Sequence, residues 1–233
     1  MWGYYLESYW LYLVIVGPAL LFAIGAQIKV KSNFNKYSRV LSSRRLTGAM
    51  AAQQVLNFYG IHNVRIELVA GKLSDHYDPK NNVIRLSEAV YNSCSVAAIG
   101  VACHEAGHAA QHAEGYAPIK VRNAIIPVCN IGSYLGIPIA FIGLFLGFDP
   151  LINIGLALYS LIAVFQFITL PVEFNASRRA IDVINQTNIL TAEEVVGTRK
   201  VLSAAAMTYV AALATSLANL LRFIIMFGRG RRK

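Results

Sequence analysis

The sequence predicts a mainly α-helical, multi-pass membrane protein with about four transmembrane helices and a small α+β domain. Three observations lead to this fold class. Of the 233 residues, 56% are hydrophobic and only 14% are charged, whereas a soluble domain carries about 25% charged residues. Four long stretches are almost free of charge, and the polar region between them shows both helical and alternating patterns. This composition also excludes a disordered chain.

Four stretches approach the roughly 20 apolar residues that a membrane-crossing helix needs. They are 9–28, 123–148, 151–172 and 201–227. Before the first stretch lies Glu7 and no basic residue, so we expect a retained anchor and not a cleaved signal peptide. Only the tripeptide FDP separates the second and third stretches, which predicts a tight hairpin. The fourth is richer in Ala, Ser and Thr and contains Arg222, so a buried or interfacial amphipathic helix is the alternative for it.

The basic residues predict the orientation in the membrane. With four crossings, the polar segments 29–120 and 173–200 lie on one face. Sixteen of the 21 Lys and Arg residues lie in or next to these segments, and five lie on the other face. This bias predicts a cell-membrane protein whose polar segments are cytoplasmic, although the basic tail GRGRRK favours the opposite orientation. We therefore attribute the net charge of +9 to the membrane topology and to contact with the lipid bilayer. No nucleic-acid partner is expected, because the sequence contains no recognised nucleic-acid-binding motif.

The segment 29–120 contains the patterns of a small α+β domain. Residues 46–59 have helical spacing of apolar side chains, with Thr47 as the N-cap and Gly60 at the end. Residues 64–68 and 83–86 have strand patterns, and a turn cluster lies between them at 78–82. Asp75, His76 and Asp78 are expected to form turns. An alanine-rich helix is expected from Ser95 to about Glu114.

That alanine-rich helix contains the motif HExxH, at His104, Glu105 and His108. Residues four apart lie on one face of a helix, so the two imidazoles point the same way. Such a pair can hold one Zn²⁺. Glu105 can then take a proton from a zinc-bound water and pass it to a leaving amine. The alternative interpretation is two buried histidines that bind backbone groups.

A catalytic zinc ion needs a third protein ligand. The candidates are His112, His62, His76 and the acidic residues. His112 lies two turns from His104, about 12 Å along the helix axis, which is too far to share one ion. Glu173 is favoured, because an ionisable residue at the end of a membrane helix is a functional candidate. Its alternative role is a solvated carboxylate that pairs with Arg178 or Arg179.

The segments HEAGHAAQH and PVEFNASRRA resemble the YugP-like family of neutral zinc metallopeptidases. More distantly they resemble integral-membrane gluzincins, the heat-shock and CAAX-prenyl proteases, which combine HExxH with ExxAD. This chain has Ser177 where those relatives have Asp. The resemblance implies a zincin-like catalytic domain that holds one Zn²⁺ per chain through His104, His108 and Glu173, with Glu105 as the base. It also implies that an extended peptide pairs with an edge strand formed by Val83, Ile84, Arg85 and Leu86.

The sequence thus predicts a membrane-embedded zinc endopeptidase that hydrolyses peptide bonds of membrane or unfolded proteins. Its expected parts are an anchor (1–28), a catalytic region (29–120), a transmembrane hairpin (121–172), a segment with the third ligand (173–200) and a last membrane helix with a basic tail (201–233). His112, Arg178, Arg179 or a tyrosine could contact substrate and stabilise an oxyanion. The alternative function is a proteolytically inactive zinc-binding scaffold or chaperone-like protein, which would not need Glu105. A transporter is disfavoured, because the spans lack paired, broken segments.

Overall fold

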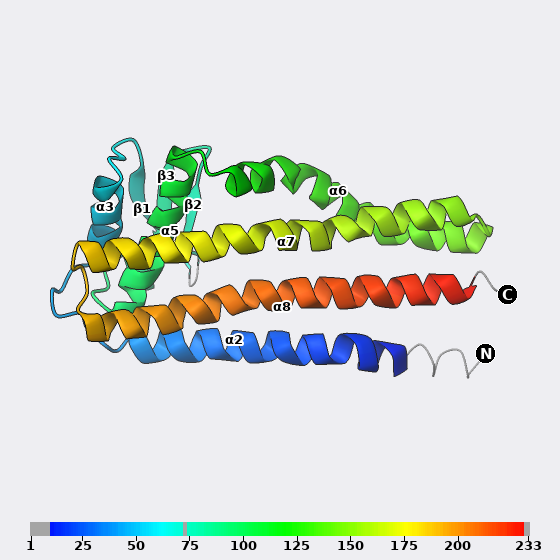
Figure 1. Ribbon diagram of the computed structural model, residues 1–233, viewed down its shortest axis with the longest axis horizontal. Coiled ribbons are helices and arrows are strands. Elements are labelled where there is room, and N and C mark those ends of the chain that lie inside the picture. The colour runs from blue at the N-terminus through cyan, green and yellow to red at the C-terminus, as the bar shows by residue number, and fades with distance from the viewer. Residues whose placement is uncertain (1–9, 72–73, 231–233) are drawn as a thin grey trace. The chain divides into compact units, whose positions relative to one another are not determined.

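The computed structural model of the chain describes residues 10–71 and 74–230 (Figure 1). The chain divides into two compact units. Among the described residues, one unit consists of 10–26, 121–170 and 207–230, and we call it the helical unit. The other consists of 27–120 and 171–206, and we call it the α+β unit.

Four long helices make up most of the chain. A π-helical turn, η1 (Tyr12–Val16), leads into α2 (Gly17–Tyr37), and the others are α6 (Ala117–Leu146), α7 (Asp149–Gln186) and α8 (Ala192–Gly230). Each is long and apolar enough to cross a membrane. The predicted fold class is therefore confirmed. Helices α7 and α8 extend well beyond the apolar stretches that predict them, because their polar halves continue into the α+β unit.

The hairpin between α6 and α7 is as tight as the sequence predicts. Only residues 147 and 148 separate the two helices, and Gly147 supplies the left-handed turn with a φ of 62°. Further along the pair, a Cβ added at Gly136 would lie 2.7 Å from the backbone nitrogen of Tyr159. A small residue at this position therefore lets the two backbones approach closely.

Among its described residues, the α+β unit contains three shorter helices and three strands. The helices are α3 (Gly48–Phe58), α4 (Glu88–Tyr91) and α5 (Val96–Ala113). Thr47 caps α3 by accepting a hydrogen bond from the Met50 amide, and Ser95 caps α5 by accepting one from the Ala98 amide, both at 3.2 Å. Both helices predicted in this region are thus confirmed.

The sheet corrects one prediction. Strands β1 (Arg65–Val69), β2 (His76–Asp78) and β3 (Val83–Ser87) form a sheet in the order β1-β3-β2. Strand β3 pairs in parallel with β1 and antiparallel with β2. The expected edge strand Val83, Ile84, Arg85 and Leu86 is therefore the central strand, and this prediction is wrong. Asp75 directly precedes β2, and its carboxylate accepts a hydrogen bond at 2.7 Å from the backbone amide of Ser87, the last residue of β3.

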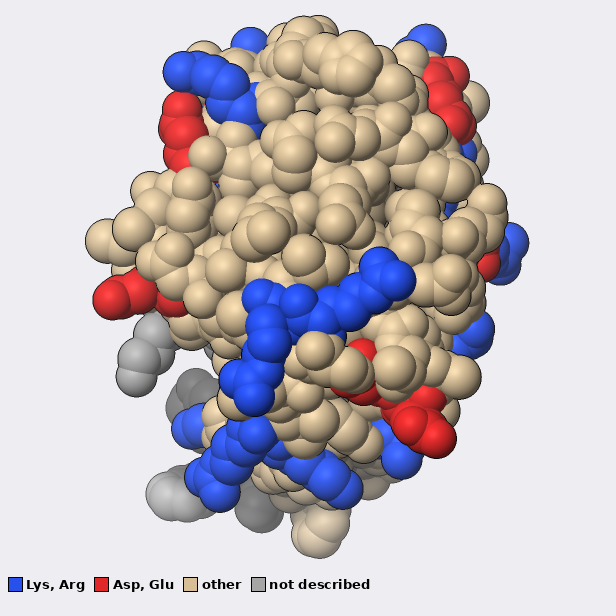
Figure 2. Space-filling view, turned by 90° about the vertical axis from the view of Figure 1, so that its left-hand side faces the viewer, with Lys and Arg blue, Asp and Glu red and all other residues tan. Residues whose placement is uncertain are grey.

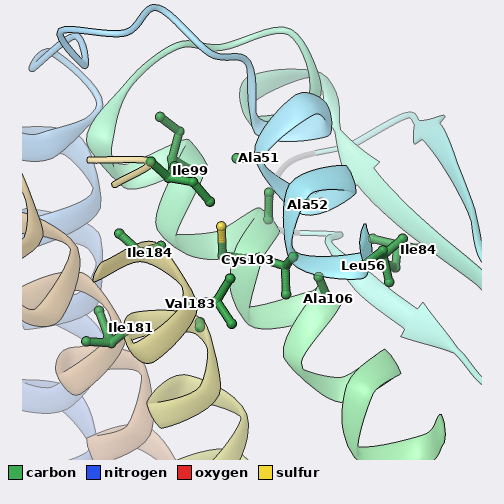
Figure 3. Close-up of a cluster of buried hydrophobic side chains, with 14 of the residues drawn as sticks. Ala51, Ala52, Leu56, Ile84, Ile99, Cys103, Ala106, Ile181, Val183 and Ile184 are labelled. Carbon is green, nitrogen blue, oxygen red and sulfur yellow. The ribbon is translucent and has the colours of Figure 1, made fainter. Parts of the chain in front are cut away.

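The core of the α+β unit lies between α3, α5, the strands and the polar half of α7 (Figure 3). Its members include Leu56 from α3, Ile84 from β3, Ile99 and Cys103 from α5, and Ile184 from α7, all fully buried. Burial raises the pKa of the Cys103 thiol far above its usual range. Cys103 is therefore a small apolar core residue, although it directly precedes a histidine of the motif.

The surface agrees with the basic composition. Figure 2 shows one face of the molecule, on which Lys and Arg side chains form a band and Asp and Glu are fewer. No acidic residue occurs between Glu7 and Glu67, although six Lys and Arg residues lie in 29–45. The C-terminal part of α2 and the loop that follows it are therefore a basic region without acidic residues.

Candidate metal centre

Two helices supply the side chains of the centre. Helix α5 carries His104, Glu105 and His108, and its spacing of 3.6 residues per turn puts the two imidazoles on one face. Helix α7 carries Glu173. Glu105 and His108 are each 8% exposed and Glu173 is 4% exposed. Ionisable groups this deeply buried need charge partners or metal coordination.

A glycine brings the two helices together at this place. Gly107 lies within the motif, and a Cβ at this position would be 2.7 Å from the backbone oxygen of Ala176 on α7. Ala176 is itself fully buried. The small side chains on both helices let α7 approach α5 closely at Ala176, less than one turn beyond Glu173. The small size of Gly107 therefore sets the distance between the histidines and the carboxylate.

Three potential ligand atoms converge between the helices. The Glu173 Oε2 atom is 3.3 Å from His104 Nε2 and 3.6 Å from His108 Nε2. The two imidazole rings are perpendicular, with centroids 4.7 Å apart. One ligand atom from each residue lies within 4.8 Å of the others. Two imidazole nitrogens and one carboxylate oxygen are a donor set of catalytic zinc sites, and three ligands leave a fourth position open. The residues therefore fit a zinc ion.

The outer nitrogen of each histidine has its own partner. The His104 Nδ1 atom is 3.1 Å from the Ser177 hydroxyl. The Ser177 hydroxyl thus contacts His104 from the position that Asp occupies in the ExxAD motif. The His108 Nδ1 atom is 3.0 Å from the Gln111 side-chain oxygen. Sequence reasoning missed Gln111, although its position three residues after His108 puts both on one face of α5.

Glu105 lies beside the converging atoms and is not one of them. Burial is the main cause that raises its pKa to about 7, and the nearby charges of His104 and Glu173 act in opposite directions on it. The backbone amide of Tyr77 in strand β2 donates a hydrogen bond to its carboxylate. Glu105 is thus held by an edge strand of the sheet, in the protonation range that suits a general base.

The other predicted residues lie around this centre in different roles. His112 Nδ1 is 2.8 Å from the Tyr77 hydroxyl, and burial raises the pKa of Tyr77 to about 12. Arg179 donates to Asn175 at 2.8 Å and forms an ion pair with Glu114 at 2.7 Å. Arg178 is exposed. His62 and His76 do not belong to the group of converging ligand atoms, which leaves Glu173 as the third member.

Comparison with known proteins points to the same chemistry. Residues 12–228 match a family described as "Putative neutral zinc metallopeptidase". The chain is 48% identical over 222 residues to a protein of Bacillus subtilis (strain 168) named "Putative membrane protease YugP". The match covers 95% of this chain and 98% of that relative. No solved structure matches the chain.

Proposed function

The chain belongs to the "putative neutral zinc metallopeptidase" family, and from this premise we propose that it is a zinc-dependent integral-membrane endopeptidase. The observation that carries the proposal is the convergence of His104, His108 and Glu173 from two helices, with Glu105 beside them. A zinc site that serves structure alone is usually closed by four protein ligands. Three ligands next to a buried carboxylate favour catalysis.

His104, His108 and Glu173 would hold one zinc ion per chain. The ion, when bound, supplies a Lewis acid that activates water and polarises the carbonyl of the scissile peptide bond. The chain itself fixes the ligands, because Ser177 and Gln111 contact the outer nitrogens of the two histidines. Such outer contacts orient ligand rings and increase their basicity.

Glu105 acts as the general base and then as the acid. Its carboxylate accepts a proton from the attacking water while the water oxygen forms a bond to the carbonyl carbon. It then gives that proton to the peptide nitrogen as the carbon–nitrogen bond breaks, which yields a carboxylic acid and an amine. A pKa near 7 suits both transfers at neutral pH.

The substrate is proposed to be an extended segment of a membrane or unfolded protein. Strand β2 is an edge of the sheet, and its Tyr77 amide reaches Glu105. An extended peptide can add to such an edge by backbone pairing, so β2 and not β3 supports this role. The excess of basic residues in and around 29–120 and 173–200 supports a cytoplasmic location of the centre.

Two variants of the full-length protein test the proposal. Glu173→Ala should lose bound zinc, because a three-ligand site has no spare ligand. Glu105→Gln should bind zinc as the wild type does and lose cleavage of a model unfolded substrate by ~100-fold or more. A chelator should abolish wild-type cleavage, and added Zn²⁺ should restore it. Equal cleavage by Glu105→Gln would refute the mechanism, and zinc binding without cleavage would favour the inactive scaffold.

A further inference from the structure

Gln111 is a fully buried polar residue at the contact between α5 and α7. Its side-chain nitrogen donates to the backbone oxygen of Val172 at 2.8 Å and to the Asn175 side-chain oxygen at 2.9 Å. Its oxygen is 3.0 Å from His108 Nδ1. Both hydrogens of its amide and one acceptor position are therefore used. Removing such a buried partner leaves the other groups unsatisfied.

Two independent neighbours determine which way the Gln111 amide points. The Val172 backbone oxygen can only accept a hydrogen bond, so it must face the amide nitrogen. Arg179 can only donate, and its Nε lies 2.8 Å from the Asn175 oxygen, so Asn175 also presents an acceptor to Gln111. Arg179 is in turn fixed by its ion pair with Glu114. The opposite amide orientation would bring oxygen against oxygen at both contacts.

The orientation of Gln111 determines the tautomer of His108. Since the Gln111 oxygen accepts, the His108 Nδ1 atom must carry the hydrogen. In the neutral ring, Nε2 then carries the lone pair, and it is this atom that faces Glu173 at 3.6 Å. Ser177 does not impose the same choice on His104, because a hydroxyl can both donate and accept.

We infer that Gln111 is a positioning residue that fixes His108 in the Nδ1–H tautomer, and that Asn175 and Arg179 fix Gln111. The series runs from Glu114 through Arg179, Asn175 and Gln111 to His108, over two helices. It presents the metal-facing nitrogen of His108 ready to bind a cation, before any ion arrives. This inference rests on the proposed zinc site and assigns a role to a residue outside it.

The first test compares two variants of the purified full-length protein. Gln111→Met keeps the length of the side chain and removes its hydrogen bonds. Thr198→Val is the matched control, because Thr198 is fully buried in the same unit and donates to the Val96 oxygen at 3.3 Å, at the other end of α5. Zinc affinity is measured by competition with a chelator. We expect a loss of ~10–100-fold for Gln111→Met and an unchanged affinity for Thr198→Val.

The second test uses the wild type without metal and does not depend on the folding of a variant. In ¹⁵N-histidine-labelled protein, the long-range ¹H–¹⁵N spectrum should show the proton of neutral His108 on Nδ1. A proton on Nε2, or full zinc affinity in Gln111→Met, would overturn the inference. If the wild type binds no zinc, the proposed site fails and this inference fails with it. If the wild type binds zinc and Gln111→Met binds it equally well, only the role of Gln111 is refuted.

Discussion

Replacing Gly107 by alanine should separate the two helices that form the proposed metal centre. The added Cβ would lie 2.7 Å from the Ala176 backbone oxygen, and a carbon–oxygen contact normally needs ~3.3–3.6 Å. The backbone cannot rotate away as a side chain could, so α5 and α7 must separate by ~0.6–0.9 Å. Overpacking of this kind costs ~1–3 kcal/mol, and the better helix propensity of alanine offsets ~1 kcal/mol of it. The net loss of stability is therefore at most ~2 kcal/mol.

The effect on the centre should exceed the effect on stability. Glu173 lies less than one turn from Ala176, so a shift of α7 changes its distance from both histidines. A misplacement near 1 Å costs ~100-fold in activity. For Gly107→Ala, zinc affinity is measured by chelator competition, activity by peptide cleavage, and stability by thermal unfolding.

Two control variants separate the shift of α7 from the effects of an added methyl group in a packed place and of the higher helix propensity of alanine. Gly100→Ala lies on the same helix, and its Cβ would meet the Thr198 Cγ2 atom at 2.8 Å, where a side chain can adjust. Gly25→Ala in α2 has open space around it. Both should keep the zinc affinity of the wild type. Wild-type zinc affinity and cleavage in Gly107→Ala would refute the reasoning.

Two further predictions concern orientation and pH. In a cysteine-free background, Ser74→Cys and Asp149→Cys should react with an impermeant thiol reagent from opposite sides of the membrane, and labelling from one side would contradict the four-span topology. Hydrogen bonds from Asn81 and then Arg85 hold the pKa of Asp78 well below its usual range. The ionised carboxylate therefore stabilises the folded state at pH values above the unfolded pKa of ~3.9, and this stabilisation is lost as the pH falls from there through the lower pKa of the folded state. Asp78→Asn should therefore unfold at a lower temperature than the wild type at pH 7, and this difference in unfolding temperature should shrink as the pH is lowered. If the difference is the same at pH 7 and in acid, the ionised carboxylate contributes nothing to stability.

The sequence predicts the parts of the fold that depend on local pattern. The four apolar stretches, the capped helices and the HExxH face each follow from composition or spacing within one segment. Glu173 could be proposed because a carboxylate at the end of an apolar stretch is unusual. Its closeness to the two histidines, however, depends on the contact between Gly107 and Ala176, which lie far apart in the sequence.

What the sequence does not predict depends on pairing between distant segments. Strand β2 has only three residues, too few for an alternating pattern to predict it. The resemblance implies β3 as the edge strand, but the pairing of β3 with both β1 and β2 makes it the central strand. The sequence predicts only a turn at Asp75, whereas its carboxylate accepts a hydrogen bond from the Ser87 amide, twelve residues later. Gln111 lies in an alanine-rich helix, where nothing but its polarity distinguishes it. Its partners Val172 and Asn175 come from another helix.

The order of the three proposed zinc ligands along the chain has a consequence for biosynthesis. His104 and His108 leave the ribosome with α5, whereas Glu173 follows 65 residues after His108, behind α6 and the first part of α7. A nascent chain that has not yet completed this hairpin carries two imidazoles and lacks the carboxylate. The proposed peptidase can therefore acquire its full set of ligands only after its central hairpin has been translated, so an unfinished chain is kept from cleaving its neighbours at the site of synthesis.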